Sequence, residues 1–215
     1  AAQLEAAEAR GMKRSDLARF LDAGREASRQ VEHNLERAAN LIVNFKQMAV
    51  DQTTSQRRAF SPREVVHSVM VSLEPSLKKQ GCRIRLQDEL QDRPGMLDSY
   101  PGPLGQVLTN LFINAAIHGY AGRGGEIRIE LSPAGEHGVL IRVCDDGDGI
   151  APENLNRIFE PFFTTRLGQG GSGLGLYLCY QIVTERLGGE ITASSTVGVG
   201  TCFCVRIPHK APNAA

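Results

Sequence analysis

The amino-acid sequence predicts an α/β two-layer sandwich, a mixed sheet with helices on one face, preceded by a long helix. Three observations favour this fold. Residues 1–56 contain no proline and space their apolar residues as a helix does. From residue 57 to residue 210, helical and strand-like segments alternate over a length typical of one domain. At 215 residues, the chain has room for that domain, an appendage and a short tail at 211–215.

The N-terminal segment is predicted to form one long helix. Apolar or small residues recur at steps of three, four or seven along residues 15–50, a helix on the order of 50 Å long. A single helix of this length cannot bury its own apolar stripe, so it needs the short segment 4–10, a second subunit, or both. We therefore expect a homodimer through the stripe of Val31, Leu35, Ala38, Ile42 and Phe45.

The remaining elements follow from turn residues and periodicity. Ser61 is expected to cap a helix that has Pro62 in its first turn and ends near Gln80, before Gly81. Further helices are predicted at 104–118, after Pro152 and at 173–187, and residues 94–103 are predicted to be a loop. Strands are predicted at 82–86, 127–131, 139–143, 191–195 and 202–207.

Composition argues against several classes of protein. The formal net charge is zero, so the chain lacks the positive charge that nucleic-acid binding uses. It contains no apolar run of about 18 residues, the length that would suggest a membrane span. We expect no membrane contact by this chain and a cytoplasmic location, although a longer parent protein could carry a membrane anchor.

The five cysteines are Cys82, Cys144, Cys179, Cys202 and Cys204, and they include no CxxC pair. This odd number without paired spacing argues against both a disulfide framework and a zinc site, and it fits a reducing compartment. Cys202 and Cys204 alternate in an apolar run, so we expect them to share one face of a strand as small core residues.

Two asparagines lie four residues apart on the predicted helix 104–118. Asparagine is unfavourable inside helices because its amide competes with the backbone for hydrogen bonds. Asn110 and Asn114 on one stripe therefore suggest a shared polar contact, for which Mg²⁺ with its waters and phosphate oxygens is suitable. Exposure of both side chains to water is the alternative, and this helix alone does not decide between them.

The segment VCDDGDGI at residues 143–150 ends a strand in an acidic turn. Asp145 at the strand's end could accept a hydrogen bond from an exocyclic amine, while Gly147 and Gly149 let the backbone approach a flat ligand. A calcium loop is disfavoured, because its twelfth position would be Asn156 rather than glutamate. A plain hairpin turn is the remaining alternative.

Two further segments lie next to the predicted helix 173–187. The run GQGGSGLGL at 168–176 offers free backbone N–H groups at a helix start, which favours phosphate, although such runs are as often flexible linkers. IFEPFFTTR at 158–166 could anchor a mobile flap through its phenylalanines and bring Thr165 and Arg166 to a terminal phosphate. Ordinary core packing is the alternative for the phenylalanines.

Taken in order, QVLTNLFINAAIHG, DDGDGI, IFEPFFTTR and GQGGSGLGL resemble the N, G1, F and G2 boxes of sensor histidine kinases. These kinases share a superfamily with gyrase, the ninety-kilodalton heat-shock chaperones and MutL. The closing GGEITASSTVGVGTCFCVRIP resembles the family's C-terminal strand pair. The similarity covers about residues 60–208, and it implies an ATP-binding catalytic domain that uses Mg²⁺.

The resemblance implies roles for individual residues. Asn114 would ligate Mg²⁺, and Asn110 would assist at the phosphates. Asp145 would accept a hydrogen bond from the adenine amino group, with Gly147 and Gly149 shaping the pocket floor. The catalytic residues implied in this way are Asn110, Asn114, Thr165 and Arg166.

Other implied contacts surround the base and the phosphates. Thr201 would support the base, and His118 stands where the family often has a ring beside the nucleotide. Ile117 stands where many members have lysine or arginine, so one phosphate contact is either missing or supplied by Arg166. Residues 159–172 would form the ATP lid. The remaining implied nucleotide-binding residues are Phe159, Gly171, Gly173, Leu174 and Gly175.

Residues 1–56 resemble the C-terminal part of the helical dimerisation and phosphotransfer region of these kinases. The family's phosphoacceptor histidine lies in an H-[ED]-x-x-[NT]-P context, which none of the five histidines here has. His33 falls on the wrong helix for that role. We expect the chain to be a fragment, with a family member that has lost this histidine as the alternative. In either case it would bind ATP but lack a standard histidine for autophosphorylation.

The function implied for the intact enzyme is phosphoryl relay. The γ-phosphoryl group would pass from ATP to a histidine and then to an aspartate on a response-regulator receiver domain. Expected partners are ATP or ADP, that receiver domain and a second copy of this chain. Two alternatives stay open: a module that binds nucleotide or receiver without transferring phosphate, and a conformational ATPase of the same superfamily.

Overall fold

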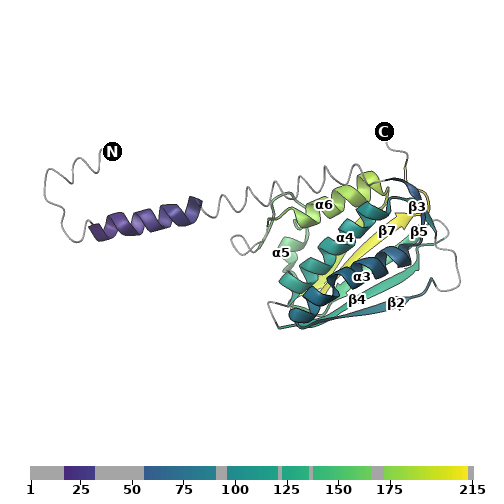
Figure 1. Cartoon of the computed structure of the whole chain (residues 1–215), viewed down its shortest axis with the longest axis horizontal. Helices are drawn as coiled ribbons and strands as arrows, with labels where there is room; N and C mark the ends of the chain where they lie inside the picture. Colours follow the sequence, from purple (N-terminus) through teal and green to yellow (C-terminus); the bar gives the residue numbers. More distant parts are fainter. Residues whose placement is uncertain are drawn as a thin grey trace. The chain divides into compact units, whose positions relative to one another are not determined.

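The computed structural model describes residues 17–31, 56–90, 96–120, 123–135, 138–165 and 172–212, apart from the side chain of His118. The chain divides into two compact units, Ala1–Lys46 and Gln47–Ala215. In the first unit, residues 17–31 form a helix, drawn in purple in Figure 1. The rest of the predicted helix 15–50, with all of its dimer stripe except Val31, lies outside the described residues.

The second unit is a two-layer α/β sandwich, as predicted. Its main sheet has five strands in the order β2-β4-β5-β7-β6. β2 and β4 run parallel and the other neighbours are antiparallel, so the sheet is mixed. The strands are β2 (Cys82–Asp88), β4 (Gly125–Pro133), β5 (Gly138–Asp145), β6 (Glu190–Thr196) and β7 (Gly200–Pro208).

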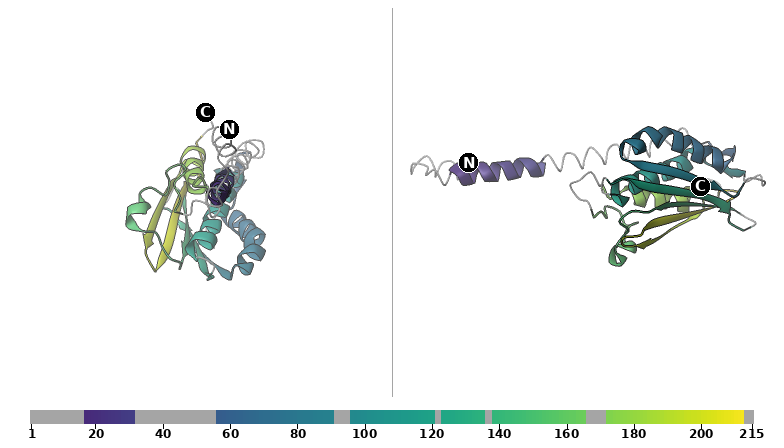
Figure 2. Two further views of the ribbon diagram at one scale, coloured as in Figure 1. Left: turned by 90° about the vertical axis from the view of Figure 1, so that its left-hand side faces the viewer. Right: turned by 90° about the horizontal axis from the view of Figure 1, so that it is seen from below.

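Helices α3, α4 and α6 cover one face of this sheet, as Figures 1 and 2 show. The helical segments are α3 (Pro62–Lys79), α4 (Pro101–Asn114), the π-helical turn η1 (Ala115–Gly119), α5 (Pro152–Leu155), α6 (Gly175–Gln181) and the π-helical turn η2 (Ile182–Arg186). Within the described ranges, no helix has both the length and the apolar character needed to cross a membrane.

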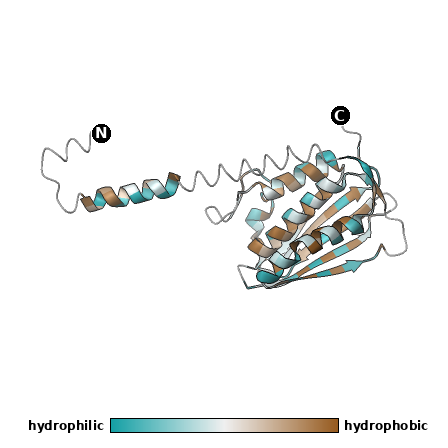
Figure 3. Cartoon of the chain, in the orientation of Figure 1, coloured by the Kyte–Doolittle hydropathy of each residue, from teal (hydrophilic) through white to brown (hydrophobic). Residues whose placement is uncertain are grey.

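The core lies between the helices and the inner face of the sheet. Ile127, Ile129 and Leu131 of β4 are fully buried, whereas the residues between them point to the other face. This period of two is what a sheet covered on one side requires, and Figure 3 shows it as alternating colours along the strands. Leu104 and Leu108 of α4 are fully buried at helical spacing and belong to the same core.

Several helix boundaries differ from the predicted ones. α4 begins at Pro101 rather than at Leu104, because prolines fit the first helical turn, where a backbone N–H has no helical partner. α6 begins at Gly175 rather than at Gly173, because Gly173 has a φ of 69° and cannot be helical there. Ser61 does precede α3, but its side chain makes no capping hydrogen bond.

A second, two-stranded sheet lies partly inside the segment predicted to be a loop. β1 (Arg58–Phe60) pairs antiparallel with β3 (Leu97–Ser99), so the loop prediction for 94–103 is wrong at β3. A strand of three residues is too short to show the alternating pattern of a strand, and its partner strand is far away in the sequence. The backbone N–H of Asp98 donates to the carbonyl of His209 at 2.7 Å, and its carbonyl accepts the N–H of Ala211 at 2.9 Å. β3 therefore also holds the C-terminal segment.

The cysteine expectations are wrong in two respects. Cys144 and Cys202 form a disulfide between β5 and β7. Cys202 and Cys204 do share one face of β7, but it is the face away from the core. Phe203, which lies between them, is 5% exposed and occupies the core side instead. Because the whole run is apolar, the sequence did not show which of its alternating residues face the core. Sequence spacing also could not show that two cysteines 58 positions apart would lie opposite each other.

Candidate functional site

Asp145, the last residue of β5, is the most constrained polar group of the candidate site. Its Oδ1 accepts the backbone N–H of Gly147 at 3.0 Å and that of Thr201 at 3.3 Å. Burial raises the pKa of this carboxyl above its usual value, and the two backbone hydrogen bonds lower it in part. Both bonds use Oδ1, so Oδ2 can accept a hydrogen bond from a ligand.

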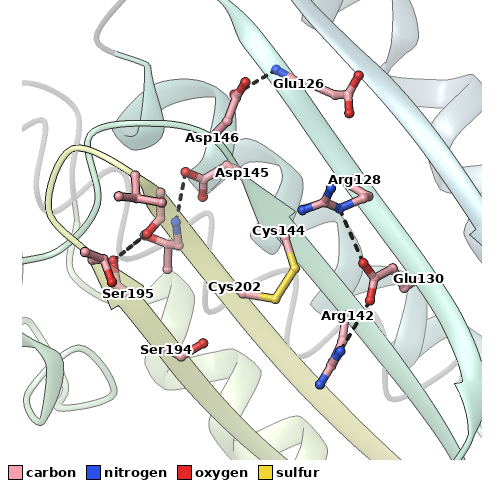
Figure 4. A pocket seen from close by; sticks show the side chains of 14 residues that line it. Glu126, Arg128, Glu130, Arg142, Cys144, Asp145, Asp146, Ser194, Ser195 and Cys202 are labelled. Carbon is pink, nitrogen blue, oxygen red and sulfur yellow. Dashed lines mark hydrogen bonds and ion pairs between the residues drawn. A yellow bond between two sulfur atoms is a disulfide. The ribbon is translucent and has the colours of Figure 1, made fainter.

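Thr201 on β7 lies directly opposite Asp145 in the sheet and is 6% exposed. Its hydroxyl lies 3.0 Å from the hydroxyl of Ser195 on β6. Ser195 donates its only hydroxyl proton to the carbonyl of Gly200 at 2.9 Å, so Thr201 must donate in the pair. Ser195 also accepts the N–H of Ile150 at 2.8 Å. Figure 4 labels Ser195 and Asp145 of this group and marks hydrogen bonds of both residues with dashed lines.

The acidic turn after β5 packs against the end of η1. The N–H of Asp148 donates to the carbonyl of Gly119 at 2.6 Å. A Cβ on Gly147 would lie 2.1 Å from that carbonyl oxygen, and a Cβ on Gly119 would lie 3.1 Å from Oδ1 of Asp145. Gly149 has a φ of 72°, a left-handed conformation that favours glycine. Close backbone approach and positive φ therefore account for the two predicted glycines.

Asn110 and Asn114 lie on α4, the helix that leads through η1 to Gly119. Within the described residues, Nδ2 of Asn114 is buried and has no hydrogen-bond partner. Asn110 interacts with the buried Cys179 thiol of α6, whose pKa is raised to about 12 by burial. An unsatisfied buried amide is costly unless a ligand completes it, which makes Asn114 a candidate ligand-binding group.

The segment with the phenylalanines packs against the core through Phe159 and Phe163. Phe159 is partly buried, and its ring packs against Tyr180 and Phe203, with centroids 5.9 Å and 6.5 Å apart. Core packing, the alternative considered for these rings, therefore applies to Phe159. Phe162 is 54% exposed and has a positive φ of 65°. A Cβ on Gly173 would lie 2.4 Å from the backbone of Phe162. The first residues of the proposed lid therefore contact the residue that directly follows it.

The structure brings Asp145, Gly147, Gly149 and Thr201 together, with Asn114 on the helix that runs into the same site. Thr165 is exposed, and Leu174 donates its N–H to the Ser172 hydroxyl at 3.3 Å just before α6. Roles at the phosphates for these lid residues stay predictions. Arg166, Gly171 and the side chain of His118 lie outside the described residues.

Sequence reasoning missed two residues that support the site. Ser195 gave no signal, because a serine in an exposed-edge strand is ordinary and its partners are set by register. Gly119 falls just after the predicted helix 104–118 and has no predicted role, although its carbonyl holds the acidic turn. A glycine directly after an Asn-rich helix is the one feature that could have pointed to it.

The comparison with known proteins fits this site. Residues 100–211 match the family described as histidine kinase-, DNA gyrase B-, and HSP90-like ATPase, and the chain belongs to this family. Its relatives include the sensor histidine kinase ZraS of Salmonella typhimurium, 40% identical over 60% of this chain and 27% of that protein. The sensor protein TorS of Escherichia coli is 36% identical over 72% of this chain and 16% of its own length.

Solved structures agree with the fold. The catalytic domain of the histidine kinase ThkA is 28% identical and has a TM-score of 0.63, over 72% of this chain and 97% of that domain. The chain thus spans nearly all of a histidine-kinase catalytic domain, but only about a quarter or less of the curated relatives named above.

Proposed function

We propose that this chain binds Mg-ATP and, in the intact protein, provides the γ-phosphoryl group for a histidine. From that histidine the group would pass to an aspartate of a response-regulator receiver domain. The observation that carries the proposal is Asp145, a partly buried carboxylate held by two backbone N–H groups with its second oxygen left for a ligand.

Adenine recognition follows from this arrangement. The exocyclic amine of adenine would donate to Oδ2 of Asp145, and a charged acceptor strengthens such a hydrogen bond. The hydroxyl of Thr201 points its proton at Ser195, so its oxygen keeps lone pairs for the base or for a bridging water. Gly147 and Gly149 let the turn pack closely beside the proposed base site, because a Cβ on either residue would meet the backbone of Gly119 or of Thr196.

The residues fit a magnesium ion together with phosphate. Asn114 offers an amide oxygen as a ligand, and its buried, unpartnered Nδ2 could donate to a phosphate oxygen. Among the described residues no cluster of three His, Cys, Asp or Glu side chains could hold a metal ion by itself. Phosphate oxygens and water would therefore complete the coordination, as Mg²⁺ sites in phosphoryl-transfer enzymes commonly do. When bound, the ion would neutralise charge on the phosphates.

Phosphate binding would involve Asn110 and the lid. Asn110 is positioned beside Cys179, and Gly173 and Gly175 lie just before and at the first residue of α6. Gly171, Leu174, Thr165, Arg166 and the ring of His118 complete the proposed set. Their task would be positioning and charge stabilisation, which supply most of the catalysis in phosphoryl transfer.

The proposed protein partners rest on family membership. A solved structure of ThkA with the response regulator TrrA, 24% identical over 80% of this chain, shows the same fold. By analogy, we propose a receiver domain as the partner of the intact protein. We further propose a homodimer through residues 1–56.

One observation favours a second candidate, a nucleotide-binding module without autokinase activity. None of the five histidines lies in the family's phosphoacceptor context. A longer protein that includes the upstream sequence would separate the two candidates. Acid-labile phosphate on a histidine supports the kinase, nucleotide binding without phosphate transfer supports the module, and steady phosphate release without phosphohistidine supports a conformational ATPase.

The direct test is calorimetric titration of the chain with ATP, in Mg²⁺ and in EDTA. Asp145→Asn keeps the shape but loses the charged acceptor, so we expect binding to weaken roughly 10- to 100-fold. Asn114→Ala should remove the dependence on Mg²⁺. Asp146→Asn is the matched control, because Asp146 accepts the N–H of Glu126 on the other side of the turn and should not affect affinity. A folded wild-type chain that binds no ATP would refute the proposal.

A further inference from the structure

A cysteine pair joins the two strands that carry the proposed adenine-binding residues. Cys144 on β5 and Cys202 on β7 are register partners with Cα atoms 4.0 Å apart, and their sulfur atoms are bonded. The next register pair along the same strands is Asp145 and Thr201. The disulfide therefore links the strands one step away from the hydrogen bond between Thr201 and Asp145.

Both cysteines lie on the face of the sheet opposite the helices. Val143 and Phe203, their neighbours in the chain, are buried in the core, so strand alternation directs the cysteines the other way. There they line a cleft of about 550 Å³, seen in Figure 4. A small thiol or disulfide can reach the sulfur atoms from this face without crossing the helical layer.

The cleft has a defined polar wall and a third cysteine close by. Arg128 and Arg142 are both paired with Glu130, at 3.3 Å and 3.4 Å. Cys204 is the register partner of Arg142, and its charge interaction raises the pKa of that guanidinium. Cys204 thus shares the face and the surroundings of Cys202 but is not bonded, which makes it a natural control.

We propose that Cys144 and Cys202 form a reversible thiol–disulfide exchange site for small thiols of the glutathione type, and that the disulfide strengthens nucleotide binding. The second part rests on the proposed nucleotide pocket. A covalent link between β5 and β7 limits the relative motion of Asp145 and Thr201, so the ligand has less to order when it binds. By thermodynamic linkage, bound nucleotide must make the disulfide harder to reduce by the same factor.

The exchange is balanced by two equivalents of thiol. A thiolate attacks Sγ of one cysteine, breaks the Cys144–Cys202 bond and leaves a mixed disulfide and one free cysteine thiolate. A second thiolate attacks the small-molecule sulfur of the mixed disulfide and releases the small disulfide. Both cysteine sulfurs then take up protons. The two electrons come from the small thiols, and the reverse sequence with the small disulfide restores the cross-link.

The test measures redox state and affinity on the same samples. The chain is equilibrated with reduced and oxidised glutathione at several ratios and then labelled with iodoacetamide after unfolding. Mass spectrometry reports which cysteines are labelled. We expect Cys144 and Cys202 to gain label together as the ratio becomes more reducing, and ATP to shift that transition toward more reducing ratios. Calorimetry should show ATP affinity about fivefold weaker in the reduced chain, a typical coupling.

Variants separate the pair from general effects of reduction. Cys204→Ser should keep the full difference in affinity, whereas Cys144→Ser and Cys202→Ser should bind ATP like the reduced wild type in both conditions. Equal melting temperatures of these variants and the reduced wild type check the fold. Independent labelling of the two cysteines, or equal affinity in both redox states, would overturn the inference. Absence of ATP binding in both states would refute the proposed function instead, while the labelling still reports on exchange.

Discussion

The carbonyl oxygen of Gly119 accepts the backbone N–H of Asp148 at 2.6 Å, which joins the end of η1 to the acidic turn after β5. Gly147 lies at this contact, and a Cβ there would come within 2.1 Å of the same oxygen. The helix that carries Asn114 and the turn that follows Asp145 are thus held at a distance that only glycine permits.

Gly147→Ala should therefore destabilise the fold and weaken nucleotide binding together. The added methyl group would press on backbone rather than on a flexible side chain, and overpacking of this kind costs about 1–3 kcal/mol. Urea unfolding measures the loss. Gly102→Ala on α4 is the control, because a Cβ there meets no atom of the described part of the chain within 4 Å. Equal stability of the two variants would contradict the close contact.

Gly175→Ala should separate stability from binding. A Cβ on Gly175 meets nothing within 4 Å among the described residues, and alanine is favoured over glycine in a helix by about 1 kcal/mol, so the melting temperature should stay equal or rise. If phosphate approaches the backbone closely at this residue, ATP affinity should fall severalfold. Differential scanning fluorimetry and calorimetry on the same samples make the comparison. Unchanged affinity would remove Gly175 from the phosphate site.

We expect the Thr201 hydroxyl to contribute to stability and to ATP affinity through its hydrogen bond with Ser195. Thr201→Val removes the donor in the 3.0 Å pair and leaves the partly buried hydroxyl of Ser195 with one partner fewer, so we expect a loss of about 1 kcal/mol of stability and weaker ATP binding. Thr201→Ser keeps the hydroxyl and should restore most of the affinity. A valine variant that binds ATP as the wild type does would show that the hydroxyl makes no contribution at the base.

The raised pKa of Asp145 predicts that, without nucleotide, this residue lowers the stability of the folded protein as the pH rises. A carboxyl whose pKa is higher in the folded than in the unfolded state stabilises the fold at low pH and loses that contribution as the pH rises through its folded pKa. Without nucleotide, Asp145→Asn should therefore melt at the same temperature as the wild type near pH 4 and above it near pH 7. A wild type that is more stable than the variant at neutral pH would contradict buried charge as the cause.

The helices and strands with a regular apolar pattern, and the order of the site's motifs along the chain, could be predicted from the sequence. The alternation of Ile127, Ile129 and Leu131 and the helical spacing of Leu104 and Leu108 mark the core faces without any knowledge of partners. Gly147 and Gly149 could be predicted as turn residues, because glycines that alternate with aspartates after a strand favour a tight turn. Such features depend on local chemistry, which the sequence carries directly.

What depends on register could not be predicted. Ser195 contacts Thr201 only because β6 and β7 pair with one particular offset, and Cys144 meets Cys202 for the same reason. The short strands β1 and β3 form through a pairing between distant residues, and neither has enough length for a pattern. Pro101 lies inside the segment predicted to be a loop, although proline is well suited to the first turn of a helix.

The small sheet of β1 and β3 has a mechanical consequence. Asp98 accepts hydrogen bonds from the Arg57 guanidinium and from the backbone of Ala211, so residues near both ends of the catalytic domain are fastened to one strand. A pulling force on the chain before Arg57 would act on this small sheet and its hydrogen bonds rather than on β5 and β7. We therefore expect the strands of the pocket to keep their register when force acts on the chain before Arg57. The same closeness would let the domain be inserted into another protein, or permuted, with a short joining segment.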